Sequence, residues 1–331
     1  MFRPCISATQ VASLIGRNPY QTASQTMYDV FKKDKALVQV IERIEHTHNR
    51  KSVSRFKNSF LRDRGIQDSV AAALDKCKVA DVAAANEVDA IQALLSAEAR
   101  SHELDMKVAA GIEVPQTEKD NAAAAVAVAL AKKTVAEAAV ALAPTVKDTL
   151  ESVEAACQKV IDRTPNLPKA MAAQLLSDAR GRVSTQRGLT NETAILDDYA
   201  AKRNVVVTER NSRMLRMDKG AFVLVGRTDG YVEAQKRVVD SKNRTRYFQS
   251  PPGYDEIQMR VYMHLLDAKD AELIEKFPNG TTRTTIFVND PDVWSEIEGA
   301  LDGVVQIMVE TAANPSSLEA IVLANTVENG D

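Results

Sequence analysis

Two short stretches, Gly226-Arg-Thr-Asp-Gly-Tyr-Val232 and Val238-Val-Asp-Ser-Lys242, each combine apolar residues with an acidic and a basic residue. Runs of β-branched and apolar residues beside glycine predict two strands. Side chains alternate along a strand, so Asp240 and Lys242 share one face. If the strands pair as a hairpin, Asp229 approaches Asp240 across the ladder. The pattern therefore predicts two acids and a lysine at one place on a sheet.

This set of residue types suggests a metal site. Two carboxylates held together repel each other, and a divalent cation offsets that cost. A lysine beside such a cation steers or deprotonates a water molecule, or stabilises a phosphate oxygen. The competing interpretation is a surface hairpin with an Asp240–Lys242 salt bridge, because an Asp-x-Lys triplet is a weak signal by itself.

Two flanking helices supply further polar residues. A helix predicted over residues 190–203 places Glu192 in its first turn, where an acid also pairs with the helix dipole. A second helix, over residues 255–268, carries Gln258 and Tyr262 on one face, four residues apart. Ordinary half-buried packing is the alternative role for that pair.

The rest of the C-terminal part alternates strands and helices, which predicts an α+β fold. The segment after Pro291 predicts an amphipathic helix as far as Met308. Near the N-terminus, Ser7 is a good helix N-cap and Gly16 a good helix end. The expected strands cover residues 205–208, 221–226, 228–232, 237–242 and 284–288.

The middle of the chain has a different composition. The 331 residues are 45% apolar and 26% charged, yet no aromatic residue occurs between Phe60 and Tyr199, and residues 71–180 hold 31 alanines and one glycine. Alanine favours helix, so this part predicts about four helices, divided by prolines, without a fixed-period repeat. We expect three parts: residues 1–66, helical and DNA-binding; 67–182, an alanine-rich helical insertion; and 183–331, the catalytic core. The insertion fits a spacer, a partner platform or an oligomer interface.

Charge and cysteine content limit the function classes. Residues 1–70 carry 12 Lys and Arg against 6 Asp and Glu, whereas the whole chain has a net charge of −3. A basic segment on an acidic body favours a polyanionic partner such as DNA, with a solvated surface as the alternative. Three scattered cysteines argue against a disulfide framework, and no segment predicts a membrane span. We expect a soluble, intracellular protein of the cytoplasm or nucleus, in a host cell if viral.

Five short motifs in this order resemble the PD-(D/E)xK nuclease superfamily, specifically its YqaJ and phage-lambda-exonuclease branch, which is RecB-like. The continuation Lys242-Asn-Arg-Thr-Arg246 is similar to versions in large DNA viruses. The motifs are Ile6-Ser-Ala-Thr9 with Gly16-Arg-Asn-Pro-Tyr20, Arg187-Gly188 with Glu192, Gly226-Arg-Thr-Asp229-Gly230, Asp240-Ser-Lys242, and Gln258 with Tyr262.

The resemblance implies a restriction-endonuclease-like mixed sheet flanked by helices, and roles for individual residues. Mg²⁺ or Mn²⁺ would be held by Glu192, Asp229, Asp240 and the backbone carbonyl of Ser241. Lys242 would orient the attacking water, Gln258 would support either Lys242 or the metal-bound water, and Tyr262 would be a supporting residue. The residues that would contact a DNA phosphate are Ser7 and Thr9, and less strongly Arg17 and Arg187.

The implied activity is phosphodiester hydrolysis by an exonuclease on duplex ends, in recombination, repair or viral genome processing. The chain departs from the branch at Asp240, where glutamate is more usual, and in its long insertion. Three alternatives stay open: an endonuclease of the same superfamily, an inactive DNA-end-binding scaffold, and an interaction protein built around the alanine-rich bundle. A homo-oligomer or a protein partner through the insertion is a further expectation.

Overall fold

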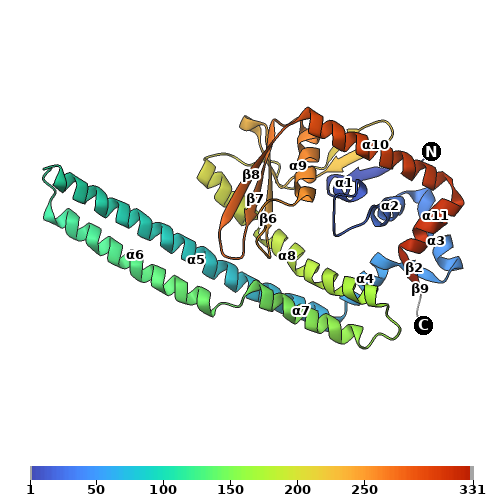
Figure 1. The fold of residues 1–331 in the computed structure, drawn as a ribbon, viewed down its shortest axis with the longest axis horizontal. Helices are drawn as coiled ribbons and strands as arrows, with labels where there is room; N and C mark the ends of the chain where they lie inside the picture. The colour runs from blue at the N-terminus through green and yellow to red at the C-terminus, as the bar shows by residue number, and fades with distance from the viewer. Residues whose placement is uncertain (1, 329–331) are drawn as a thin grey trace.

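The computed structural model describes residues 2–328 and combines a body of mixed sheet and helices with a long helical projection (Figure 1). The predicted α+β class is confirmed at this level. None of the described helices combines the length and apolar character needed to cross a bilayer.

The larger sheet has four strands in the order β5-β6-β7-β8. β6 and β7 run parallel and are joined by helix α9 (Gly253–Leu266), while the outer pairs are antiparallel. A parallel pair requires such a crossover. The strand β7 was not predicted, because its acids interrupt the apolar pattern. The bounds are β5 (Gly230–Val232), β6 (Arg237–Asn243), β7 (Asp270–Lys276) and β8 (Thr282–Val288).

A three-stranded sheet joins the two ends of the sequence around the insertion. Its order is β1-β4-β3, with β1 (Cys5–Ser7) parallel to β4 (Val223–Gly226) and β3 (Leu215–Asp218) antiparallel to β4. Residues 5–7 therefore lie beside 223–225, although more than 200 residues separate them. The strand predicted over 205–208 is reduced to one bridge, Thr208 to Tyr231, so that prediction was wrong in extent.

Helices cover the sheets and form the main core with them. Helix α1 (Ala8–Leu14) begins after Ser7, as predicted, and the chain turns at Gly16, whose φ is +73°. The main core includes Phe31 and Leu224, both fully buried. The other elements are η1 (Glu233–Gln235), α2 (Ala23–Phe31), α3 (Lys35–Thr47), β2 (Arg50–Ser52), α4 (Val53–Leu61), α10 (Pro291–Ala313), α11 (Pro315–Ala324) and β9 (Thr326–Glu328), which pairs with β2.

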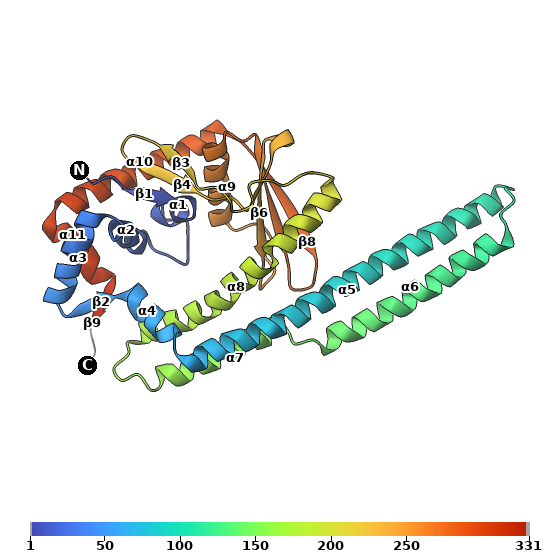
Figure 2. The ribbon, with the colours of Figure 1, turned by 180° about the vertical axis from the view of Figure 1, so that it is seen from behind.

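The alanine-rich part forms α5 (Arg64–Ala109), α6 (Gln116–Leu142), α7 (Val146–Ile161) and the first half of α8 (Lys169–Arg203). In both views, α5 and α6 lie side by side and extend away from the body (Figures 1 and 2). The four predicted helices are present.

Helix α8 corrects two expectations. It runs without a break from the insertion into the body, so the boundary expected at residues 182–183 falls inside a helix, and Glu192 lies well after the first turn. Its first half packs with α5 and α7 through Leu175, and its second half packs on the sheet through Leu196. Gly181 and Gly188 do not end the helix, since one glycine costs only about 1 kcal/mol.

Candidate active site

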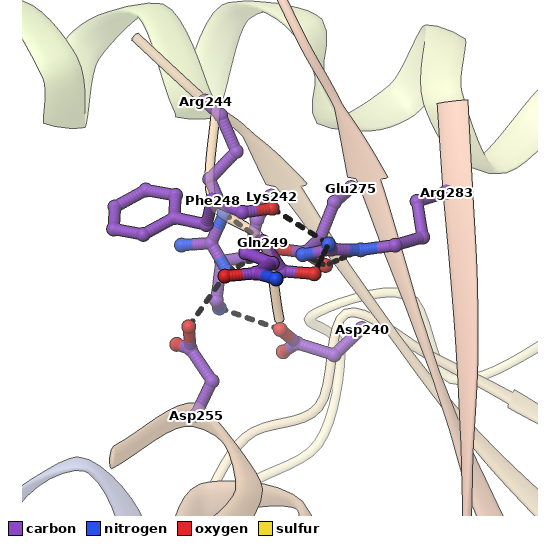
Figure 3. Close-up of polar contacts among 8 residues, drawn as sticks. All are labelled: Asp240, Lys242, Arg244, Phe248, Gln249, Asp255, Glu275 and Arg283. Carbon is purple, nitrogen blue, oxygen red and sulfur yellow. Dashed lines mark hydrogen bonds and ion pairs between the residues drawn. The ribbon is translucent and has the colours of Figure 1, made fainter. Parts of the chain in front are cut away.

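The candidate site is built around Asp240, in the middle of β6. Its side chain is 1% exposed, and its Oδ2 lies 2.5 Å from Nζ of Lys242 (Figure 3). Apart from this ion pair, neither carboxylate oxygen has a hydrogen-bond partner among the described residues. Burial raises the pKa of Asp240 to about 7; Lys242 lowers it and Asp229 raises it further. Oδ1 of this carboxylate therefore has no partner among the described residues, and Lys242 balances its charge through Oδ2.

Asp229 precedes β5 and is held against β6. Its Oδ2 accepts hydrogen bonds from the backbone N–H of Ser241, at 2.9 Å, and from Ser241 Oγ, at 3.2 Å. The pairing of Gly230 with Val239 brings this about, so the expected approach across a hairpin is confirmed. Burial raises the pKa of Asp229, while Lys242 lowers it.

Lys242 stays a cation in this setting. Burial alone would lower the pKa of its amine, but the negative charges of Asp240 and Asp229 outweigh burial, and Asp255 adds to them. The pKa is therefore raised. A protonated amine orients a water molecule or neutralises a phosphate oxygen.

Glu192 approaches the same place from α8. Its carboxylate accepts a hydrogen bond from Nδ2 of Asn211. Burial raises the pKa of Glu192, and the negative charge of Asp240 raises it further, so the two carboxylates are close enough to repel each other. Within residues 2–328, no three His, Cys, Asp or Glu side chains converge closely enough to hold a metal by themselves. A three-carboxylate ligand set therefore stays a prediction.

The donors present nevertheless fit a hard cation. Mg²⁺ and Mn²⁺ prefer carboxylate and carbonyl oxygens, and a buried carboxylate without donors is costly. Asp240 offers one oxygen without any partner, Oδ1, and the pairing of Gly230 with Val239 puts Asp229 opposite Asp240. The residues therefore fit Mg²⁺ or Mn²⁺ on the chemistry of the donors.

Gln258 and Tyr262 support this place from α9. Gln258 Nε2 donates to Tyr262 Oη at 2.9 Å, so the predicted shared face is confirmed. Burial raises the pKa of Tyr262, and Asp240 raises it further. The ring of Tyr262 packs on Gly226, where a Cβ atom would lie 2.8 Å from Cε1. Glycine at 226 therefore lets α9 approach β4 closely.

The predicted phosphate contacts near the N-terminus lie at the start of α1. Ser7 and Thr9 hydroxyls are 3.0 Å apart, and the backbone N–H of Ser7 donates to Gln10. The strand pairing puts Ser7 opposite Val225, one residue before Gly226. Arg17 is exposed and lies in the turn after α1.

Arg187 does not fit its predicted role as a phosphate contact. Its side chain is 2% exposed and makes a two-point ion pair with Asp81 of α5, with Nε 3.0 Å from Asp81 Oδ2. Its Nη1 donates to the carbonyl oxygen of Arg244 at 2.6 Å. Because α8 continues as a helix, Arg187 faces α5 instead of solvent. The Arg187 side chain therefore connects α5, in the insertion, to the residue that follows β6.

A buried ionic network that the sequence did not reveal holds the loop after β6. Arg244 Nη2 lies 2.7 Å from Asp255 Oδ2, and its Nε donates to Glu275 at 2.8 Å (Figure 3). Arg283 donates to the other oxygen of Glu275 and to the carbonyl oxygens of Phe248 and Gln249. The only sequence signal was the basic run after Lys242.

That loop forms one wall of a shallow pocket of about 400 Å³, opposite the turn that carries Arg17. Tyr20 and Tyr254 meet edge to face, with ring centroids 5.8 Å apart. Arg246 donates to Tyr20 Oη at 2.7 Å and lies over the ring of Phe248. Aromatic and basic walls of this kind suit stacked bases and phosphates.

No family model matches the chain, and no curated protein matches it. Among solved structures, it is similar to a phage-related exonuclease from Haemophilus somnus 129PT, at 18% identity and a TM-score of 0.35, covering 39% of this chain and 72% of that one. It is also similar to an alkaline exonuclease from Laribacter hongkongensis, at 14% and 0.34, covering 51% and 81%. Likenesses of this size assign neither a family nor an activity.

Proposed function

We propose that the chain is a Mg²⁺- or Mn²⁺-dependent DNA nuclease that hydrolyses phosphodiester bonds at the ends of duplex DNA, and that it belongs to the PD-(D/E)xK superfamily, in its YqaJ and lambda-exonuclease branch. One observation carries the proposal: Asp240 is buried beside Asp229, with one oxygen paired to a protonated Lys242 and the other without any hydrogen-bond donor. Few structural roles require that combination.

Each side chain of the candidate site would have a separate role. Asp240 and Asp229 would hold the cation, with Glu192 and the carbonyl of Ser241 as further ligands. The bound cation would polarise the phosphate and make hydroxide available near neutral pH. Lys242, as a cation, would orient the attacking water and neutralise charge on the phosphate.

Substrate contacts would come from the N-terminal segment. Residues 1–70 have a net charge of +6, which favours phosphate through counterion release. The hydroxyls of Ser7 and Thr9 start α1, beside β4. Arg17 and Tyr20 line the shallow pocket, where the end of a strand would stack.

The test is digestion of end-labelled linear duplex and closed circular duplex with Mg²⁺, Mn²⁺ or EDTA. We expect cleavage of linear duplex alone, its loss in EDTA, and a loss of at least about 100-fold for Asp229→Ala. Asp198→Asn, at an exposed acid on the same helix as Glu192, is the matched control. Equal activity of Asp229→Ala and the unchanged protein would refute the proposal, and cleavage of circles would indicate an endonuclease.

A second candidate is a DNA-end-binding protein without cleavage. The observation that favours it is the closed Asp240–Lys242 ion pair, which occupies one oxygen of the carboxylate. Metal-dependent binding of duplex ends without any product, over a range of salt concentrations, would support it instead.

A further inference from the structure

The arm, defined as residues 83–109 of α5 with residues 116–142 of α6, is a two-stranded coiled coil. On α6 the buried and half-buried positions recur at alternating intervals of three and four residues, the spacing of a heptad seam; on α5 the same spacing runs from Ala83 to Leu104, and Ala84, Ala85, Val88 and Ile91 are buried or half-buried as well. No such repeat was expected from the sequence. The seam positions are Ala83, Glu87, Ala90, Leu94, Ala97, Ser101 and Leu104 on α5, and Lys119, Ala122, Val126, Ala129, Lys133, Ala136 and Val140 on α6.

This seam is a weak one for its length. The buried residues of α6 are Ala122, Ala129 and Ala136, one in each heptad. Burying a methyl group contributes only about 0.8 kcal/mol. Small side chains let the two helices approach closely, but Val128, Leu130, Val135 and Leu142 of α6 stay exposed outside the seam.

A second apolar stripe runs along the outside of α6. Val128, Ala131, Val135 and Ala139 follow one another at intervals of three or four residues and therefore share one face. Val128 is 56% exposed and Val135 is 71% exposed. With the neighbouring part of α5, this stripe lines a groove of about 750 Å³.

The exposure is concentrated on this part of the chain. Of the 18 large hydrophobic residues that the described structure exposes, ten lie between residues 64 and 142. Two of the ten, Val128 and Val135, line the groove, and an exposed apolar patch of this kind marks an interaction site. The same segment carries 12 Asp and Glu against 8 Lys and Arg, so its charge disfavours DNA as the occupant.

We propose that the groove binds the arm of a second copy of this chain, so that two arms form an antiparallel four-helix bundle. The groove carries Asp89 on its α5 wall and Lys132 on its α6 wall, and neither forms an ion pair with another described residue. Around a two-fold axis, Asp89 of each copy faces Lys132 of the other. The groove is therefore complementary to itself in charge.

The face is also large enough for a stable dimer. At 1.5 Å per residue, the 27 residues of α6 extend about 40 Å, and two helices side by side are about 20 Å wide. Their product, about 800 Å², equals the area that each partner contributes to a standard interface. Because the arm projects from the body in both views, the groove stays accessible (Figures 1 and 2).

The first test measures the mass of the full chain by sedimentation equilibrium from about 1 to 100 µM. We expect a dimer for the unchanged protein and a rise of at least about 30-fold in the dissociation constant for Val135→Glu, since the interface would bury an unpaired charge. Leu130→Glu is the matched control, because Leu130 is 51% exposed but does not line the groove. Far-UV circular dichroism checks that both variants keep their helices.

The second test exchanges the charges. We expect Asp89→Lys and Lys132→Asp each to weaken the dimer and the double variant to restore it, which binding of an unrelated partner would not do. An unchanged protein that is monomeric at 100 µM overturns the proposal. So does a Leu130→Glu variant that dissociates as far as Val135→Glu, or a double variant that stays monomeric.

Discussion

The ion pair between Arg187 and Asp81 gives the sharpest prediction about stability. Asp81→Asn keeps the shape of the side chain and one acceptor oxygen but removes its charge, and leaves the Arg187 guanidinium, 2% exposed, with two neutral acceptors, the new amide oxygen and the carbonyl of Arg244. Breaking a buried pair by removing one partner costs about 3–5 kcal/mol. We expect the lower end, about 3 kcal/mol, because these two acceptors remain.

The assay is urea unfolding followed by circular dichroism. At about 3 kcal/mol per M, a loss of about 3 kcal/mol lowers the midpoint by about 1 M. Glu103→Gln removes an exposed ion pair with Lys107 on the same helix and should cost no more than about 0.5 kcal/mol. Equal midpoints for the two variants would show that Arg187 is not a buried anchor. Tighter DNA binding by Asp81→Asn would instead indicate that Arg187 contacts a DNA phosphate.

Three further predictions concern pH, stacking and packing. In EDTA, the raised pKa of Asp240, about 7, means that the folded protein holds a proton that the unfolded chain has lost above about pH 4. Stability should therefore fall by up to about 4 kcal/mol between pH 4 and 7, and Asp240→Asn should flatten that slope in urea titrations. Tyr20→Ala should raise the KM for duplex ends about tenfold, with little change in kcat, whereas Tyr20→Phe keeps the aromatic ring and should leave the KM unchanged. An unchanged KM in the alanine variant would show that Tyr20 does not contact the substrate. Gly230→Ala should lower thermal stability by about 1–3 kcal/mol, because its Cβ would lie 2.4 Å from Val207 Cγ1, whereas helical Gly188→Ala meets no atom within 4 Å and should be neutral or stabilising.

The local patterns near the site were informative because the alternation of side chains along a strand depends only on neighbouring residues. The spacing of Asp240 and Lys242 placed them on one face, and the ion pair between them confirms it. Helix α9 was expected within two residues of its observed bounds. The strand β7 was not predicted because Glu272 and Glu275 interrupt its apolar pattern. Both acids are 0% exposed in the structure, and acids in a buried strand are tolerated only when arginines from other elements neutralise them.

The sequence by itself determined the class of the fold, the acid–acid–lysine pattern and the alanine-rich helices, since these depend on residues close together in the chain. Only the tertiary structure decided which long-range partners meet. In the structure, Arg187 donates to Asp81 instead of facing solvent, and Arg283 donates to the carbonyl oxygen of Phe248. The reason is physical: a buried charge takes its partner from whichever element packs against it, and no local spacing records that choice.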